Sequence, residues 1–171
     1  MAGIADFRGF PFARSRVDAC GTYLGHRAYW KLYAIENYLR VLLHSVLFDQ
    51  IGASWFDSVV EQGRRKEIEK LKTKSLANKA HTLPGRHSIY YLYLSDLSKV
   101  MLTANHLIAK VVPEVNLWIV KIEEVRVPRN LVGHMNFPNE RDRGRIDTLH
   151  SELTGLVQSL ESKPGFKLRV P

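Results

Sequence analysis

An arginine and a histidine stand five positions apart in the segment Arg129-Asn130-Leu131-Val132-Gly133-His134. These two residue types can cleave RNA without a metal ion. That reaction needs a group that takes the proton from the 2′-hydroxyl, a group that returns a proton to the leaving 5′-oxygen, and a fixed positive charge at the phosphate. A histidine exchanges protons near neutral pH, and an arginine stays charged and binds phosphate oxygens through two parallel N–H donors. Arg129 is therefore the candidate charge stabiliser and His134 the candidate proton carrier.

The spacing of this pair predicts a site made by two chains. Five positions on an α-helix separate two side chains by roughly 140°. Arg129 and His134 therefore do not share a face, whereas Asn130 and His134, at i and i+4, do. One chain alone builds half a site. A two-fold axis close to this helix would bring Arg129 and His134 of both copies into one cleft, and Leu131 and Val132 offer apolar surface to bury there. The spacing thus favours a homodimer.

Taken alone, the hexapeptide also fits an arginine beside a turn and a surface histidine, but other residues of the chain add to it. The segment Ala34 to Arg40 reads Ala-Ile-Glu-Asn-Tyr-Leu-Arg. It resembles the E-N-x-L-R signature on the first helix of one branch of the HEPN superfamily. The segment from Arg129 resembles that superfamily's R-x4-H motif, in which a polar residue such as Asn130 follows the arginine. The resemblance covers about residues 28 to 160 and includes, in the family's order, Trp55, Tyr91 to Leu94, and Asp96-Leu97.

The resemblance implies an antiparallel helical bundle that dimerises and cuts RNA without a metal or other cofactor, leaving a 2′,3′-cyclic phosphate and a 5′-hydroxyl. It is compatible with a toxin or defence effector that has an antitoxin or regulatory protein as a partner. Glu36, Arg40 and Asn130 would support the catalytic pair, although Glu36 and Arg40, at i and i+4, could simply form an intrahelical ion pair. Some HEPN domains bind RNA or a partner protein without cutting. A non-catalytic binding module is therefore the alternative, followed by an unrelated basic helical nucleic-acid binder.

Charge points to an anionic partner. The formal net charge is +8, which favours RNA, DNA or an acidic membrane surface. Lysines and arginines gather after residue 63, and this segment is either a solvated face or a strip that contacts phosphates. The candidate RNA-binding residues within it are Arg64, Arg65, Lys66, Lys70 and Lys72.

Periodicity predicts an all-α fold, an antiparallel bundle of about five to six helices. The chain divides into an irregular arm over residues 1–22, a helical domain over 23–162 and a loose tail over 163–171. Apolar residues at helical spacing predict a helix from about Leu24 to Gln50 that is buried on most of its circumference and stops at Gly52. A later helix should be interrupted or kinked at Pro128, because proline lacks an N–H donor. Ile89 to Leu94 has strand-like composition but no partner strand, so we expect an extended lead-in to a helix.

Several function classes are excluded or disfavoured. A lone cysteine, Cys20, cannot form an internal disulfide, and the histidines show no zinc-ligand spacing, so no metal site is expected. The chain has neither a G-x-x-x-x-G-K-[ST] phosphate loop nor a G-x-S-x-G nucleophile motif. The most hydrophobic stretch, Tyr29 to Phe48, carries charged residues that a membrane span of about 20 residues would exclude. We therefore expect a cytoplasmic protein that does not enter the membrane.

Overall fold

The protein is all-α. The computed structural model describes residues 4–78 and 80–171, so residues 1–3 of the predicted arm and Lys79 of the basic segment lie outside the described residues. Within the described part there is no strand, and six helices are ten residues or longer, which confirms the predicted fold class. In chain order the elements are η1 (Phe7–Gly9), α1 (Arg14–Leu24), η2 (Gly25–Tyr29), α2 (Trp30–Ile51), α3 (Trp55–Val59), α4 (Gln62–Ala77), η3 (Ser88–Tyr91), α5 (Leu94–Thr103), α6 (Asn105–Ile108), α7 (Val115–Gly133) and α8 (Glu140–Glu161).

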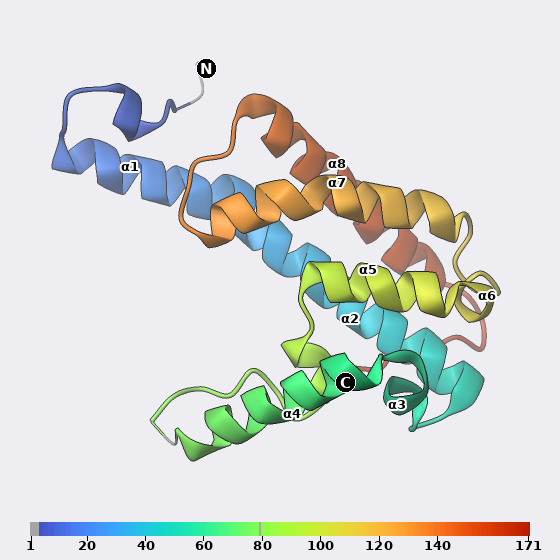
Figure 1. The fold of residues 1–171 in the computed structure, drawn as a ribbon. Helices are drawn as coiled ribbons and strands as arrows, with labels where there is room; N and C mark the ends of the chain where they lie inside the picture. The colour runs from blue at the N-terminus through green and yellow to red at the C-terminus, as the bar shows by residue number, and fades with distance from the viewer. Residues whose placement is uncertain (1–3, 79) are drawn as a thin grey trace.

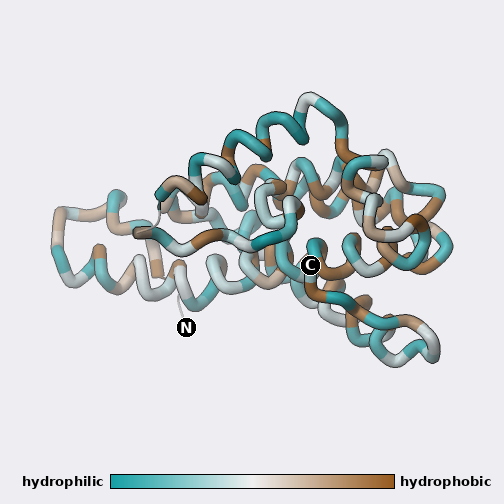
Figure 2. Tube along the Cα trace, turned by 90° about the horizontal axis from the view of Figure 1, so that it is seen from below, coloured by the Kyte–Doolittle hydropathy of each residue, from teal (hydrophilic) through white to brown (hydrophobic). Residues whose placement is uncertain are grey.

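Helix α2 is the centre of the bundle. It packs against α5, α6 and α8, while α7 packs against α5 and α8 (Figure 1). Helices α5, α7 and α8 alternate in direction, as expected for an antiparallel bundle. Hydrophobic residues recur along the helices between hydrophilic ones, so that one side of each helix can face the core (Figure 2). The side chains that α2 buries are Leu32, Ile35, Leu39, Leu42, Leu43, Val46 and Leu47, and the helix ends before Gly52 at φ 80°, as predicted.

The prediction of an irregular arm over residues 1–22 is wrong for its second half. Arg14–Leu24 forms α1, which continues through the π-helical turn η2 into α2. Gly21 suggested irregular structure, but a glycine inside a helix costs only about 1 kcal/mol, which packing can offset. The earlier residues fold back onto α1, where the thiol of the buried Cys20 donates a hydrogen bond to the carbonyl of Ala5.

Pro128, predicted to interrupt or kink its helix, does not interrupt it. Helix α7 runs through the buried Pro128 to Gly133, because one missing N–H donor does not outweigh the packing on either side. The residue that caps the C-terminal end of α7 is His134, and the next residue, Met135, has a φ of 57°. The backbone N–H groups that follow the helix donate to its last free carbonyls, from Met135 to Val132 and from Asn136 to Leu131.

The C-terminal tail has no regular secondary structure, but it is anchored rather than loose. Phe166 packs against the core. The backbone N–H of Arg169 donates to the Ser45 hydroxyl at 2.7 Å, and the Tyr90 hydroxyl donates to the carbonyl of Pro171 at 3.3 Å. The tail therefore joins the middle of α2 to the segment η3. Within the described residues, no helix combines the length and apolar character needed to cross a membrane.

Candidate active site

Arg129 projects from α7 toward α2 and is held there by Glu36. Its Nε donates to Glu36 Oε1 at 2.5 Å, and its side chain is 28% exposed. No other hydrogen bond of this guanidinium is found within the described part of the chain, so its terminal nitrogens remain free for a ligand. A charged donor oriented in this way, with most of its atoms shielded from water, is suited to binding an anion such as a phosphate.

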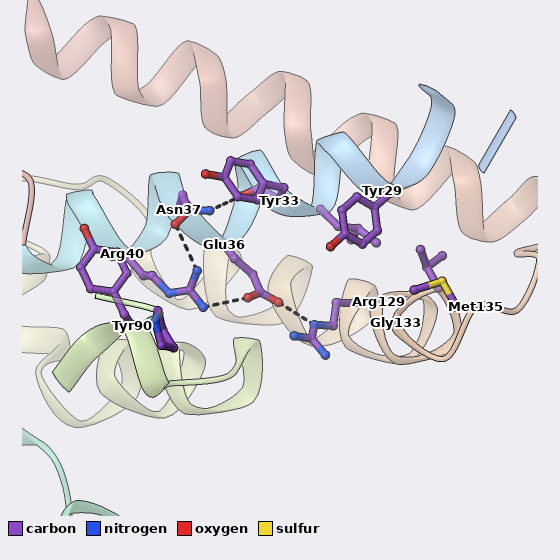
Figure 3. Close-up of a pocket in the computed structure, with 12 residues that line it drawn as sticks. Tyr29, Tyr33, Glu36, Asn37, Arg40, Tyr90, Arg129, Gly133 and Met135 are labelled. Atoms are coloured by element: carbon purple, nitrogen blue, oxygen red, sulfur yellow. Dashed lines mark hydrogen bonds and ion pairs between the residues drawn. The ribbon is translucent and has the colours of Figure 1, made fainter. Parts of the chain in front are cut away.

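The same carboxylate binds a second arginine. Arg40 Nη2 donates to Glu36 Oε2 at 2.9 Å and to the carbonyl of Leu92 at 3.0 Å, and Arg40 Nη1 donates to Asn37 Oδ1 at 3.1 Å (Figure 3). The side chains of Glu36 and Arg40 are each only 12% exposed. Two guanidinium groups therefore share one carboxylate, which leaves a net positive charge in a partly dehydrated site. Glu36 pairs with Arg40 within α2, as one interpretation predicted, and it also contacts Arg129 on α7.

These residues border a groove of about 470 Å³ between α2 and α7, which we call the arginine groove. Tyrosines line it beside the charged residues, and Tyr29 and Tyr33 are 53% and 68% exposed. Figure 3 shows both rings on the α2 side, opposite Arg129 and Gly133. Aromatic rings next to arginines form a surface to which single-stranded RNA can bind, with bases on the rings and phosphates at the guanidinium groups. The residues that line the groove are Tyr29, Leu32, Tyr33, Glu36, Asn37, Arg40, Pro84, Tyr90, Arg129, Val132, Gly133 and Met135.

His134 is exposed at the C-terminal end of α7 and does not line the arginine groove. Asn130, one turn earlier, is also exposed. Val120 and Val127 precede His134 at intervals of seven residues, so all three lie on about the same face of the helix. These valines are 55% and 61% exposed. Within one chain Arg129 thus faces the groove and His134 faces outward, as the spacing of the motif predicted.

The predicted RNA-binding residues of α4 differ in their contacts, and only some of them are free to bind a phosphate. Arg64 donates two hydrogen bonds to Asp96 Oδ2, at 2.8 and 3.1 Å, and one to Glu67 at 2.8 Å. Its guanidinium therefore ties α4 to α5, and the prediction that it contacts phosphate does not fit this geometry. Arg65 pairs with Asp57 at 3.2 Å, and Lys72 donates to the Ser88 hydroxyl at 3.1 Å.

Lys66 and Lys70 are the members of this set that face solvent. Both are exposed, and no ion pair involving either is found among the described residues. Together with Arg65 they line a broad surface groove along α4. They are therefore the residues of α4 that are best placed to contact a phosphate backbone.

Sequence reasoning missed the tyrosines of the arginine groove. Spacings of three or four residues separate Tyr29 at the end of η2 from Tyr33, Glu36 and Arg40 on α2, which is the signal that could have placed them on one face. It also missed a buried cluster of His44, His87 and Trp55, in which Trp55 Nε1 donates to His44 Nδ1 at 3.1 Å. No local pattern joins residues so far apart in the chain.

The described residues contain no group of three or more histidine, cysteine, aspartate or glutamate side chains that could hold a metal ion.

Comparison of the chain with known proteins gave no matching family model, no similar curated protein and no similar solved structure. The functional argument therefore depends on the geometry of the arginine groove and on the motifs that border it.

Proposed function

We propose that this protein is an HEPN-type endoribonuclease that works without a metal ion and combines residues of two identical chains. The observation that carries the proposal is the arrangement of Arg129. Glu36 holds it at the edge of a tyrosine-lined groove, and the exposed His134 follows it at the end of the same helix. This arrangement provides a cation for a phosphate, aromatic surface for bases and an accessible group that can exchange protons.

The proposed reaction has two proton transfers and exchanges one phosphorus–oxygen bond for another. His134 takes the proton of the 2′-hydroxyl, and the 2′-oxygen attacks the adjacent phosphorus. The bond from phosphorus to the 5′-oxygen breaks, and that oxygen receives a proton from His134 of the partner subunit. The products are a 2′,3′-cyclic phosphate and a 5′-hydroxyl. Arg129 binds the phosphate oxygens, on which negative charge grows in the transition state.

Glu36 is a positioning residue in this scheme. It neutralises part of the charge of Arg40 and Arg129 and fixes the direction of the Arg129 guanidinium. A pre-oriented donor stabilises developing charge without reorganising during the reaction, which is the main source of such stabilisation in enzymes. Asn130, exposed on the face of α7 next to His134, would contact the RNA or the partner chain.

The outer face of α7 supports a homodimer. Besides Val120 and Val127, Leu117 is 45% exposed on the same side of the helix, so three apolar side chains are exposed on the side that leads to His134, with the exposed Glu123 and Glu124 between them. Exposed apolar side chains that gather on one side of a helix, with charged residues around them, are compatible with a surface that a second chain covers. If a second copy docks about a two-fold axis that runs along this side of α7, the two His134 side chains lie close to each other. They also lie close to the two arginine grooves.

The test is RNA cleavage with analysis of the product ends. The wild-type protein should cut single-stranded RNA in the presence of EDTA, and a kinase should label the 3′ fragment directly because it begins with a 5′-hydroxyl. Arg129→Ala and His134→Ala should each lower the rate by roughly a hundredfold or more while the fold is retained. Loss of cleavage in EDTA would contradict the mechanism, and full activity of His134→Ala would contradict the residue assignment.

One observation favours the alternative, a binding module without catalysis: within one chain His134 stands outside the groove that contains Arg129. If a well-folded wild-type dimer binds RNA but never cuts it, this alternative replaces the ribonuclease proposal. In that case Arg129→Ala should still weaken RNA binding, because the groove charge acts on the phosphate whether or not a bond breaks.

A further inference from the structure

A second cavity lies beside the arginine groove, between the N-terminal segment, α1 and the loop from α7 to α8. We call it the arm pocket. It has a volume of about 470 Å³, which is within the range of ordinary small-ligand sites. Its walls are mainly aromatic and aliphatic. The residues that line it are Asp6, Phe7, Arg8, Val17, Cys20, Gly21, Leu24, Gly25, Tyr29, Met135 and Phe137.

The arm pocket and the arginine groove share two wall residues, Tyr29 and Met135. Both shared residues occupy unusual backbone positions. Tyr29 ends the π-helical turn η2, and Met135 has a φ of 57° directly after the Arg129 to His134 segment. Single π turns inside helices occur frequently at functional sites. The two cavities are therefore neighbours, and a ligand whose charged part lies at Arg129 can extend into the arm pocket.

The chemistry of the arm pocket suits a flat aromatic group with polar edges. Phe7, Phe137 and Tyr29 offer ring surface, and polar groups stand at one side. There Arg8 pairs with Asp6 and donates from Nη1 to Asn136 Oδ1 at 3.1 Å, which connects the N-terminal segment to the loop after α7. A nucleobase has this character, because its faces stack on aromatic rings while its edge forms hydrogen bonds.

We propose that the arm pocket binds the nucleobase of the nucleotide next to the phosphate that Arg129 holds. This inference rests on the proposed function, since it takes RNA as the ligand of the arginine groove. It assigns a role to the N-terminal segment and α1, which complete the substrate site. The arm pocket then determines which base can stand beside the scissile phosphate, whereas Arg129 and His134 act on any RNA backbone.

Gly21, the glycine of α1, allows the arm pocket to be filled without disturbing the fold. A Cβ atom added at Gly21 meets no other atom within 4 Å, so a larger side chain there would extend into open space. Gly155 in α8 is a matched control. It is also an exposed helical glycine with nothing within 4 Å, and it lines neither cavity. Gly21→Leu should therefore block the arm pocket, and Gly155→Leu should make the same change elsewhere.

The experiment measures binding separately from cleavage. The probes are two fluorescent oligomers of equal length with 2′-fluoro sugars, which cannot be cut because they lack the attacking 2′-hydroxyl. One carries a base on every sugar, and the other lacks one base. The wild-type protein should bind the oligomer with all its bases roughly five- to hundredfold more tightly, the range expected for stacking of one base. Gly21→Leu should lose most of that preference, and Gly155→Leu should keep it.

Equal preference in Gly21→Leu and the wild type would overturn the proposal, as would a wild-type protein that does not distinguish the two oligomers. If Gly21→Leu fails to fold by circular dichroism, Phe7→Ala provides the second variant, because it removes aromatic wall instead of filling space. Neither binding result depends on catalysis. The base-binding proposal can therefore be wrong while His134→Ala still abolishes cleavage, and it can be correct while the protein cuts no RNA.

Discussion

The arginine groove and helix α4 both present positive charge, but they hold it in different ways. In the groove, Arg40 and Arg129 are ordered by one shared carboxylate whose side chain is 12% exposed. On α4, Lys66 and Lys70 extend into solvent, and the arginines pair with carboxylates at the surface or with α5. Ordered, shielded charge can act on one phosphate at a defined place, whereas solvated charge attracts any polyanion.

This difference distinguishes residues held in a fixed geometry from a segment that is only rich in positive charge. The sequence has more cations in α4 than in the groove, so charge counting alone points to α4. Arg129 differs from the shielded Arg64 of α4 in its free donors: Glu36 binds only its Nε, whereas Arg64 donates to both Asp96 and Glu67. We therefore expect changes to the groove and to the outer face of α7 to affect the proposed catalysis and the stability, and changes to α4 to affect mainly affinity.

The largest expected effect comes from the outer face of α7. Val127→Asp would place like charges together at a two-fold interface, which costs several kcal/mol and should raise the dimer dissociation constant by roughly a hundredfold or more. Sedimentation should show a monomer, and cleavage should fall with the loss of the dimer. Leu76→Asp on α4 is the control, since Leu76 is 59% exposed and Val127 is 61% exposed. A wild-type monomer that cleaves RNA would contradict the shared site.

The next effect concerns the carboxylate that orders the groove. Glu36→Gln leaves two arginines, one of them only 12% exposed, without their shared charge partner. Removing one member of such a pair should lower the free energy of unfolding by about 3 kcal/mol. Glu123→Gln is the matched control, because its pair with Arg126 is 44% exposed on both sides and should contribute less than about 1 kcal/mol. Urea unfolding measures both, and equal losses would show that Glu36 does not order the groove.

The elements of the fold were largely predictable, and the site was predictable in part. Helical spacing predicted the end of α2 at Gly52 but not where the helical structure begins, and the motif spacing predicted that Arg129 and His134 point in different directions. The helix over Arg14–Leu24 and the uninterrupted course of α7 at Pro128 were not predicted, because packing outweighed local propensity. The arm pocket could not be predicted, since it forms where α1 meets the loop after α7, and no local pattern joins segments so far apart.

A smaller effect is expected on the α4 side of the comparison. Replacing Lys66 and Lys70 by glutamine removes two solvent-facing cations, so RNA affinity should fall at low salt. The slope of log affinity against log salt should become shallower by about 1.4, if each lysine contacts one phosphate of a single strand. Cleavage of saturating RNA should be unchanged. Arg64→Gln is the contrasting variant, because it breaks the bonds to Asp96 and should lower stability more than it lowers affinity. An unchanged salt slope in the double variant would make α4 a solvated face.

The smallest effect is a pH dependence of stability on the α4 side. Burial, followed by the nearby His44 and Lys72, lowers the pKa of His87 to about 4 from its usual 6.5. Its ring stacks on the buried Trp55, and its Nδ1 accepts the backbone N–H of Ile89 at 3.1 Å. These contacts hold the segment η3, on which α4 packs.

Below pH 6.5 the unfolded chain therefore binds a proton at His87 that the folded chain does not bind until about pH 4. The free energy of unfolding should fall as the pH drops through this window and be restored above it. His87→Asn keeps an acceptor for Ile89 but cannot be protonated, so its stability should depend less on pH than that of the wild type, while the exposed His106→Asn should behave as the wild type does. Hydrogen exchange at pH 5 should also show α4 and η3 opening before α7, which carries Arg129, because His87 holds η3 whereas α7 packs against α5 and α8. Equal loosening of both regions, or an unchanged pH dependence in His87→Asn, would remove this last distinction between them.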